Sequence, residues 1–331
     1  MNNIARVNKK EREDLFITTA RDIGLPEAMV EKDFWVCWVL DYLFQNSPWA
    51  EKLAFKGGTS LSKCFGLINR FSEDIDVVLD WRLLGYDTEV LWEERSRTQQ
   101  EKINKETIIK TNEFLCGVLI PELQSGFSSI ISDKFSLYID DVDLQTVCFA
   151  YPRSFDENSI IDVVRIEMGV LAAWTPVEYG TVESYAAQLH PHVFETPSTR
   201  ILTVSPKRTF WEKITILHKE AFRRDKKFPS RYSRHYYDLF CLDKSEYKEQ
   251  AYADLELLNQ VVRFKNKFYH SGSAHYNLAK PGFMRLMPPD DCVPIISNDY
   301  THMRNMIFGE YPDFNDIMDC IERMEHEINE L

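Results

Sequence analysis

Apolar positions in the first eighty residues change from helical spacing to strand spacing. Residues 10–23 fit one helix. A second helix is predicted from Pro26, over PEAMVEKDFWVCWVLDYLF, because its apolar residues recur every three or four positions. So many of its residues are apolar that we expect it to lie in the core. After it we predict a short strand over LAFKGG, a short helix over TSLSKCFGL and a second strand over DIDVVLDW.

The middle of the chain begins with a long helical pattern and continues with strand patterns. Residues 89–124 fit a helix that is charged in its first half and apolar in its second, and Pro121 is expected to kink or restart it. Three segments rich in β-branched and aromatic residues then predict successive strands, namely FSLYIDD, LQTVCFAY and IIDVVRIEMGVLA. Up to residue 200 the pattern is interrupted by Pro152, Pro176, Pro191 and Pro197.

The last third of the chain is predicted to be mostly helical. A helix begins with Ser205 as its N-cap and Pro206 at its first position, and apolar residues share one face of it. Helical patterns continue through SRHYYDLFCL to the closing FNDIMDCIERMEHEINEL. The order of helices, mixed sheet and helices predicts a sheet domain over residues 1–200 and a helical domain over residues 201–331.

Composition places the chain among ordinary globular proteins. It has 331 residues, 44% hydrophobic and 27% charged. No apolar run approaches the length of a membrane span, and the polar N-terminus is no signal peptide. The seven cysteines form no CxxC pair and are odd in number, which favours reduced cysteines and a cytoplasmic location over a disulfide framework or zinc site.

The charge of the chain is unevenly distributed. The net charge is −13, yet the segment from Pro206 to Tyr236 contains ten Lys and Arg residues and three acidic residues. A basic segment in an acidic chain suggests a local anionic ligand, and a solvated helix face is the alternative. Trp211 and the nearby tyrosines fit either base stacking or the core of the helical domain.

The candidate chemistry lies in KGGTSLSKCFGLINRFSEDIDVVLD, which begins at Lys56. Asp74 and Asp76 are two apart in a predicted strand, so their carboxylates project from the same face. Like charges that close are tolerable when a divalent cation such as Mg²⁺ lies between them. The preceding GGTS turn opens a helix and offers backbone N–H groups to a phosphate. A GG turn or a DxD pair alone is commonplace, but together they favour metal-assisted phosphoryl or nucleotidyl transfer.

The same stretch closely resembles the signature of the AbiEii/AbiGii nucleotidyltransferase toxins, within the DNA polymerase β-like superfamily. In that family a GG[TS]xLxK segment precedes RxSxDxD. VEKDFWVCWVL, FWEKITILHKEA, SRHYYDLFCL and SNDYTHMRNMIFGE resemble further family segments in the right order, from about residue 28 to 328. The resemblance implies an α+β fold: a polymerase-β-like mixed sheet with flanking helices, followed by a mostly helical C-terminal domain that completes the active site.

The resemblance also assigns roles within the motif. It implies that Gly57, Gly58, Thr59 and Ser60 hold the triphosphate of a nucleotide, and that Asp74 and Asp76 bind Mg²⁺ or Mn²⁺. Lys63 lies one helical turn further on and is either a phosphate ligand or a surface lysine. The superfamily usually has a third carboxylate on a neighbouring strand. Glu167 is the best candidate, unless it is an edge residue paired with Arg165, and Asp162 is the fallback.

Two residues of the helical domain also receive active-site roles from the resemblance. Lys213, in FWEKI, would neutralise phosphate charge in the transition state from an exposed position in a cleft facing the carboxylates. Asp238, in RHYYDL, either orients Lys213 or pairs with Arg234 one helical turn away. His235 is expected to pack or to form a hydrogen bond rather than act as a base.

The function implied is that of a Mg²⁺-dependent enzyme moving a nucleotide from an NTP to an acceptor, as the toxin of a bacterial toxin–antitoxin or phage-defence pair. In some family members the acceptor is the 3′ end of a tRNA, and the basic segment 207–234 suits an RNA backbone. A cognate antitoxin would be the protein partner. Two alternatives stay open: nucleotidylation of a protein hydroxyl, and a non-catalytic NTP-binding interaction protein.

Overall fold

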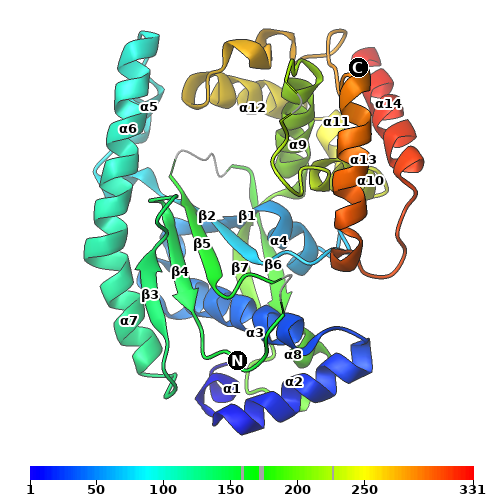
Figure 1. Cartoon of the computed structure of the whole chain (residues 1–331). Coiled ribbons are helices and arrows are strands. Elements are labelled where there is room, and N and C mark those ends of the chain that lie inside the picture. Colours follow the sequence, from blue (N-terminus) through cyan, green and yellow to red (C-terminus); the bar gives the residue numbers. More distant parts are fainter. Residues whose placement is uncertain (158–159, 171–174, 226) are drawn as a thin grey trace. The chain divides into compact units, whose positions relative to one another are not determined.

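The chain packs as two compact units in the computed structural model, which describes residues 1–157, 160–170, 175–225 and 227–331 (Figure 1). The first unit comprises residues 1–65 and 72–203, and the second comprises residues 66–71 and 204–331. The short segment Gly66–Phe71 therefore packs with the C-terminal residues, although the chain on both sides of it belongs to the first unit.

The first unit is built on a seven-stranded mixed sheet with the strand order β3-β4-β5-β2-β1-β7-β6. The central strand β2 runs antiparallel to β1 and parallel to β5, and β4 runs antiparallel to both β3 and β5. The strand bounds are β1 Leu53–Lys56, β2 Asp74–Leu79, β3 Ser136–Ile139, β4 Thr146–Ala150, β5 Val164–Gly169, β6 Val177–Glu183 and β7 Ser198–Val204. The mixed sheet with flanking helices confirms the predicted α+β class.

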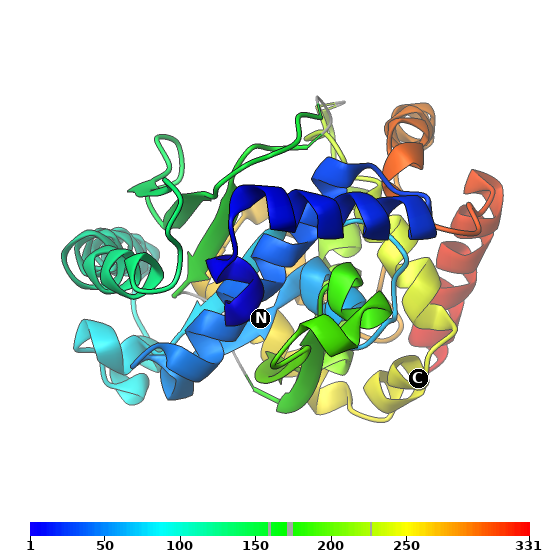
Figure 2. The ribbon, with the colours of Figure 1, turned by 90° about the horizontal axis from the view of Figure 1, so that it is seen from below.

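Helices flank this sheet. Helix α3 (Glu27–Asp41) contacts β2, β5 and β6, and α2 (Lys9–Ile23) lies alongside it (Figure 2). From Ala28 to Asp41 every residue of α3 is buried, as expected for a core helix. Its aromatic side chains join the sheet to helix α7 (Ile120–Ser128), with ring centroids 5.8 Å apart for Trp35 and Phe149 and 4.6 Å apart for Trp38 and Phe127. The remaining short helices are α1 Asn2–Arg6, α4 Gly57–Lys63 and α8 Tyr185–Leu189.

The helix predicted over residues 89–124 is divided in the structure. It comprises α5 (Thr88–Trp92), α6 (Arg97–Phe114), a π-helical turn over Leu115–Leu119 and α7 (Ile120–Ser128). Helix α6 starts afresh because Ser96 and Gln99 form a capping box. Pro121 lies in the first turn of α7, where a missing N–H costs no helical hydrogen bond. The proline therefore restarts the helix.

Two strands were not predicted, and one is shorter than expected. The sequence pattern missed β6 and β7, which follow one another in the sheet and place β6 at its edge. The apolar side chains of Val177 and Tyr179 in β6 are exposed, so this strand lacks the alternation of buried apolar and exposed polar residues that identifies a strand from sequence. Strand β5 spans only Val164–Gly169, and the end of the predicted segment, residues 171–172, lies outside the described residues.

The second unit is helical. Helix α9 (Pro206–Ala221) has Ser205 as its N-cap and Pro206 at its first turn, as predicted. It contacts three further helices, α10, α11 and α12, and α10 also contacts α14. The bounds of these and the remaining helix are α10 Arg234–Asp243, α11 Glu246–Tyr252, α12 Leu255–Phe268, α13 Val293–His302 and α14 Phe314–Glu330. Across the described ranges of both units, no helix is both long enough and apolar enough to span a bilayer.

Candidate active site

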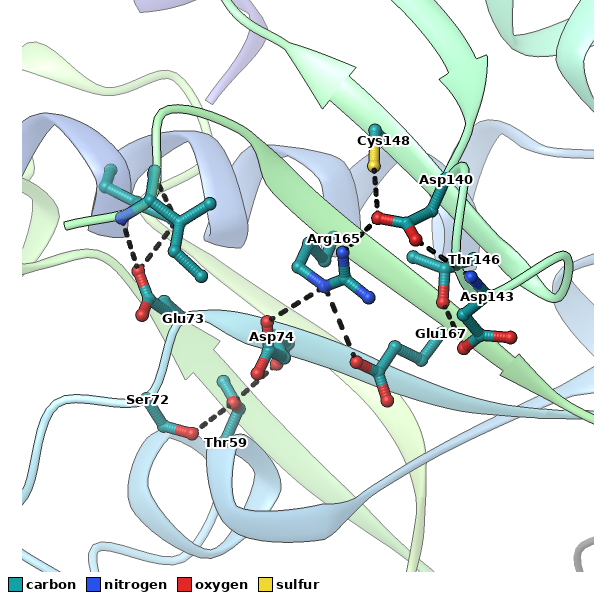
Figure 3. A network of polar contacts seen from close by, with 12 residues as sticks. Thr59, Ser72, Glu73, Asp74, Asp140, Asp143, Thr146, Cys148, Arg165 and Glu167 are labelled. Carbon is teal, nitrogen blue, oxygen red and sulfur yellow. Dashed lines mark hydrogen bonds and ion pairs between the residues drawn. The ribbon is translucent and has the colours of Figure 1, made fainter. Parts of the chain in front are cut away.

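Three carboxylates and one guanidinium meet on one face of two adjacent parallel strands. The strand register pairs Asp74 with Arg165 and Asp76 with Glu167. Because side chains alternate along a strand, all four project from the same face, while Ile75 and Ile166 between them are fully buried on the other. Figure 3 shows Asp74, Arg165 and Glu167 of this group. The shared face of Asp74 and Asp76 follows from their spacing. The place of Glu167 beside Asp76 follows from the pairing of β2 with β5.

The surroundings of this cluster disfavour its negative charge. Burial raises the pKa of the Asp74 carboxyl, and the nearby charges of Asp76 and Glu73 raise it further. Burial, followed by Asp76 and Asp74, raises the pKa of Glu167 to about 7. The Oδ1 atom of Asp74 is buried, and no group in the described part of the chain donates a hydrogen bond to it. The cluster therefore has negative charge that its surroundings do not neutralise and a carboxylate oxygen without a hydrogen-bond donor among the described residues. A bound cation would compensate for both.

The residues present fit a hard divalent cation in the chemistry of their side chains. Carboxylate oxygens are the ligands that Mg²⁺ prefers, and those of Asp74, Asp76 and Glu167 arise from adjacent register positions. As they stand, no three His, Cys, Asp or Glu side chains among the described residues converge tightly enough to hold a metal ion.

The fallback ligand Asp162 lies apart from this cluster. It precedes β5, its side chain is 63% exposed, and it forms an ion pair with Arg153. The geometry therefore favours Glu167 over Asp162 as the third carboxylate. The alternative prediction was that Glu167 is an edge residue paired with Arg165. Arg165 does lie near Glu167, but Glu167 also faces the aspartate pair rather than an open edge of the sheet.

The glycine turn before α4 allows Asp76 to take its position. Gly57 adopts a φ of +85°, which disfavours any residue with a Cβ, and a Cβ built there would overlap with the carboxylate of Asp76. The two glycines lie in the first turn of α4, so the helix begins two residues earlier than predicted. The turn and the aspartate pair are thus in direct contact.

Gly57→Ala is expected to remove activity by displacing Asp76. Backbone strain at positive φ costs about 1–2 kcal/mol, and the added methyl group pushes the carboxylate away as well. Gly24→Ala is the matched control, because Gly24 has a φ of +70° and nothing within 4 Å of an added Cβ. Both variants should lose stability in thermal unfolding, Gly57→Ala the more because of its overlap with Asp76, but only Gly57→Ala should lose nucleotide transfer. Equal activity in the two variants would contradict this role of Gly57.

The hydroxyl groups of Thr59 and Ser60 are engaged inside the protein. Thr59 Oγ1 lies 2.6 Å from the carbonyl oxygen of Asp74 and 2.7 Å from Ser72 Oγ, and Ser60 Oγ donates to the carbonyl of Gly57 at 2.9 Å. Both residues are buried. In the structure these side chains fix the turn against β2, and the role of Thr59 and Ser60 in holding a triphosphate stays a prediction.

Lys63 is neither a surface lysine nor directed at the glycine turn. Its amine forms a buried ion pair with Asp33 of α3 and lies 3.7 Å from the ring centroid of Tyr185. Only 7% of the Lys63 side chain is exposed. These contacts favour a positioning role, in which Lys63 ties the C-terminal end of α4 to α3, over direct contact with a phosphate.

Three consecutive charged residues of α3 support the site, although the sequence motifs predict no role for them. Glu31 accepts backbone hydrogen bonds from Ser154 and Phe155, Lys32 pairs with Glu73 at 2.8 Å, and Asp33 pairs with Lys63. Glu73 directly precedes Asp74. The sequence EKD at residues 31–33 could have predicted this, because charged residues in an otherwise apolar core helix need polar partners.

In the second unit, Lys213 and Asp238 are brought together with Arg70. Asp238 lies 2.7 Å from Lys213 Nζ and accepts two hydrogen bonds from Arg70, at 2.7 and 2.9 Å. Lys213 is only 7% exposed, which corrects the expectation of an exposed cleft lysine. Burial alone would raise the pKa of Asp238, but Arg70 and Lys213 outweigh it and hold that pKa well below its usual range.

Arg70 also attaches the segment before β2 to the helical unit. Phe71 N donates to Met306 O and Phe308 N donates to Asn69 O, each at 2.7 Å. Asp238 is therefore the counter-ion of both Lys213 and this segment, rather than a partner of Arg234. Arg70 belongs to the recognised RxSxDxD motif, but only the tertiary structure shows what it binds.

The basic segment offers fewer free charges than its sequence suggests. Arg208 and Lys213 are buried in ion pairs, and Lys207 pairs with Asp254 at 2.8 Å. Trp211 is fully buried, so it belongs to the core rather than to a stacking surface. Lys226 lies outside the described residues. The exposed cations of the segment are Lys219, Arg224, Lys227 and Arg234.

A second basic stretch, which the sequence motifs did not predict, lies further along the helical unit. Residues 257–289 contain five Lys and Arg residues and no acidic residue. His218 of α9 joins this stretch to the basic helix, because its ring lies 3.1 Å from the carbonyl of His275 and accepts from Arg285 N at 3.2 Å. Two aromatic side chains of the stretch are about half exposed, Tyr269 at 54% and Phe283 at 56%. The absence of acidic residues from 257–289 could have predicted this basic stretch from the sequence.

Comparison with known proteins points to one family. A family model described as "Nucleotidyl transferase AbiEii toxin, Type IV TA system" matches residues 38–322. No curated protein matches the chain. Among solved structures, the chain is similar to MenT4, a nucleotidyltransferase toxin from Mycobacterium tuberculosis H37Rv, at 16% identity, covering 95% of this chain and 97% of that chain with a TM-score of 0.43. It is also similar to JHP933 from Helicobacter pylori, at 15% identity, covering 92% and 94% with a TM-score of 0.44.

Proposed function

Because the chain belongs to the AbiEii family of nucleotidyltransferase toxins of type IV toxin–antitoxin systems, we propose that it transfers a nucleotide from an NTP to an acceptor in a Mg²⁺-dependent reaction. The observation that carries the proposal is the juxtaposition of Asp74, Asp76 and Glu167 on β2 and β5, with Gly57 leaving room for Asp76. The three carboxylates would hold Mg²⁺ or Mn²⁺, which supplies Lewis-acid stabilisation of phosphate oxygens when bound.

The side chains around the carboxylates would act by holding this arrangement. Thr59 and Ser60 fix the turn, so that the backbone N–H groups of Gly57 and Gly58 are presented to the phosphates of the nucleotide. Lys63 holds the other end of α4 through Asp33. Because these groups are already ordered, little conformational entropy is lost when the nucleotide binds.

Lys213 and Asp238 would act as a pair within the helical unit. A lysine amine can neutralise charge that develops on a phosphoryl group in the transition state. Asp238 would orient this amine, which lies 2.7 Å away, and its charge opposes the lowering of the Lys213 pKa by burial. Arg70 shares the same carboxylate and so links the position of Lys213 to the segment that leads into β2.

The acceptor we propose is RNA, in particular the 3′ end of a tRNA. Its binding surface would consist of the exposed cations at the end of α9 together with the acid-free stretch 257–289. Lysine and arginine side chains would contact phosphates, while Tyr269 and Phe283 offer rings for stacking. As the toxin of a pair, in a phage-defence setting or otherwise, the protein would act in the cytoplasm and be opposed by a cognate antitoxin.

A labelling experiment tests the donor and the acceptor together. The protein is incubated with each α-³²P-labelled NTP, Mg²⁺ and total tRNA, and the products are separated on a denaturing gel. Label on tRNA in one or more lanes, lost with EDTA, is the expected result. Label that appears only on protein would establish the alternative acceptor, a protein hydroxyl. Absence of label on either class with all four NTPs would refute nucleotide transfer under these conditions.

Charge reversal on the proposed RNA surface should weaken tRNA binding. We expect Lys280→Glu with Arg285→Glu to lower tRNA affinity about tenfold or more and to reduce the salt dependence of binding by roughly two phosphate contacts. The matched control is Lys9→Glu with Lys10→Glu, which reverses two exposed charges on α2 in the other unit. Gel-shift titrations at two salt concentrations measure both quantities. Equal losses in the two double variants would place the RNA surface elsewhere.

A further inference from the structure

Arg165 lies among the carboxylates of the proposed metal site without hydrogen-bonding to them. Its Nε atom is 3.9 Å from Asp74 Oδ1 and 3.7 Å from Glu167 Oε1 (Figure 3). Both distances suffice for electrostatic attraction, but they exceed the length of a hydrogen bond. The guanidinium therefore offsets part of the negative charge and leaves the carboxylate oxygens available.

Asp140 holds Arg165 at this distance. The Nη1 group of Arg165 donates to Asp140 Oδ2 in a short ion pair. The other oxygen of Asp140 accepts the backbone N–H groups of Val142 and Asp143, both at 2.9 Å, so the carboxylate is fixed by the turn that follows β3. These two backbone donors, together with Arg165, lower the pKa of Asp140 to about 2, so it remains charged. Arg165 is thus anchored on the side away from Asp74 and Glu167.

An unanchored arginine would occupy the site instead. The planar guanidinium forms strong paired hydrogen bonds with carboxylates, and Asp74 and Glu167 lie within reach of a small side-chain rotation. Direct pairing would cover Asp74 Oδ1, for which no donor was found in the described part of the chain. The ion pair with Asp140 therefore lets Arg165 compensate the charge of the carboxylates and prevents it from covering their oxygen atoms.

We propose that Arg165 is a positioning residue which stands in for part of the charge of the divalent cation, and that Asp140 restrains it so that the ligand oxygens of Asp74 and Glu167 stay open. The proposal rests on the metal site of the proposed function. It implies that the metal-free cluster is tolerable because of Arg165, and that metal affinity is held below the value which three uncompensated carboxylates would have. Two single substitutions should then have opposite effects on metal affinity.

The test measures binding of Mn²⁺ alone to the nucleotide-free protein by electron paramagnetic resonance. Arg165→Met should bind Mn²⁺ about tenfold more tightly, because one positive charge near the cation is gone. In EDTA this variant should melt at a lower temperature than the wild type, and added Mn²⁺ should raise its melting temperature more than that of the wild type. Asp140→Asn should bind Mn²⁺ on the order of fivefold more weakly, because the released arginine pairs with the ligand carboxylates.

A double variant separates the action of Asp140 on Arg165 from its own charge. If Asp140 acts by restraining the arginine, Asp140→Asn should have little effect on Mn²⁺ affinity in the Arg165→Met background. Arg97→Met and Glu101→Gln serve as charge-matched controls, because they form an exposed pair on α6 with 66% and 59% of their side chains accessible. Neither control should change Mn²⁺ affinity.

The outcomes separate this proposal from the one on which it rests. If Asp74→Asn leaves Mn²⁺ affinity unchanged, the metal site is misassigned and the proposed function loses its metal ligands. If Asp74→Asn abolishes binding but a folded Arg165→Met binds Mn²⁺ no more tightly than the wild type, the metal site stands and the role of Arg165 is refuted. A full effect of Asp140→Asn in the Arg165→Met background would likewise refute the restraint.

Discussion

Asp76→Asn is expected to abolish nucleotide transfer and, in the absence of metal, to raise the melting temperature of the protein. The loss should be roughly 10³-fold or more, because a metal ligand contributes several kcal/mol of transition-state stabilisation. Stability should rise by about 1 kcal/mol, because Asp76 raises the pKa of both Asp74 and Glu167 and its removal relieves that repulsion. Labelled transfer assays and thermal unfolding in EDTA measure the two effects.

Asp162→Asn is the matched control for this prediction. Asp162 precedes the same strand that carries Glu167, but its carboxylate is mostly exposed and pairs with Arg153. We expect this variant to keep transfer activity and to change in stability by less than about 1 kcal/mol. Retention of transfer by Asp76→Asn, or its loss in Asp162→Asn, would show that the carboxylates at work are not those on β2 and β5.

Asp238→Ala should strongly destabilise the helical unit. It leaves Arg70 and Lys213 as two buried cations without a counter-ion, and breaking a buried ion pair in this way costs about 3–5 kcal/mol. The segment Gly66–Phe71 would lose its strongest attachment to the second unit as well. Urea unfolding followed by tryptophan fluorescence measures the loss as a lower midpoint.

Two further variants, Asp243→Ala and Lys213→Met, serve as controls for the stability loss of Asp238→Ala. Asp243, on the same helix, also pairs with a lysine and an arginine, but Arg323 is 49% exposed, so Asp243→Ala should cost only about 1 kcal/mol. Lys213→Met keeps the two hydrogen bonds between Arg70 and Asp238 and should destabilise less than Asp238→Ala does, while still removing transfer. A Lys213→Met protein that is stable and fully active would limit the role of Lys213 to packing.

Local chemistry determined much of this protein from sequence alone. The shared face of Asp74 and Asp76 follows from the two-residue period of a strand, and the start of α9 follows from a serine and a proline in adjacent positions. The buried nature of α3 follows from its apolar composition. The family likewise follows from short motifs in a fixed order, and the match over residues 38–322 confirms it. Each of these rests on residues that are close together in the chain.

Only the tertiary structure decided which distant groups meet. The choice of Glu167 over Asp162 depends on the register between β2 and β5, whose residues are about ninety positions apart in the chain. The partner of Asp238 is Arg70, 168 residues away, rather than the arginine one turn away on its own helix. Thr59, Ser60 and Lys63 turn inward because buried polar groups take whatever partners the packing provides. Side-chain type and spacing predict what a residue can bind, whereas burial and register determine what it does bind.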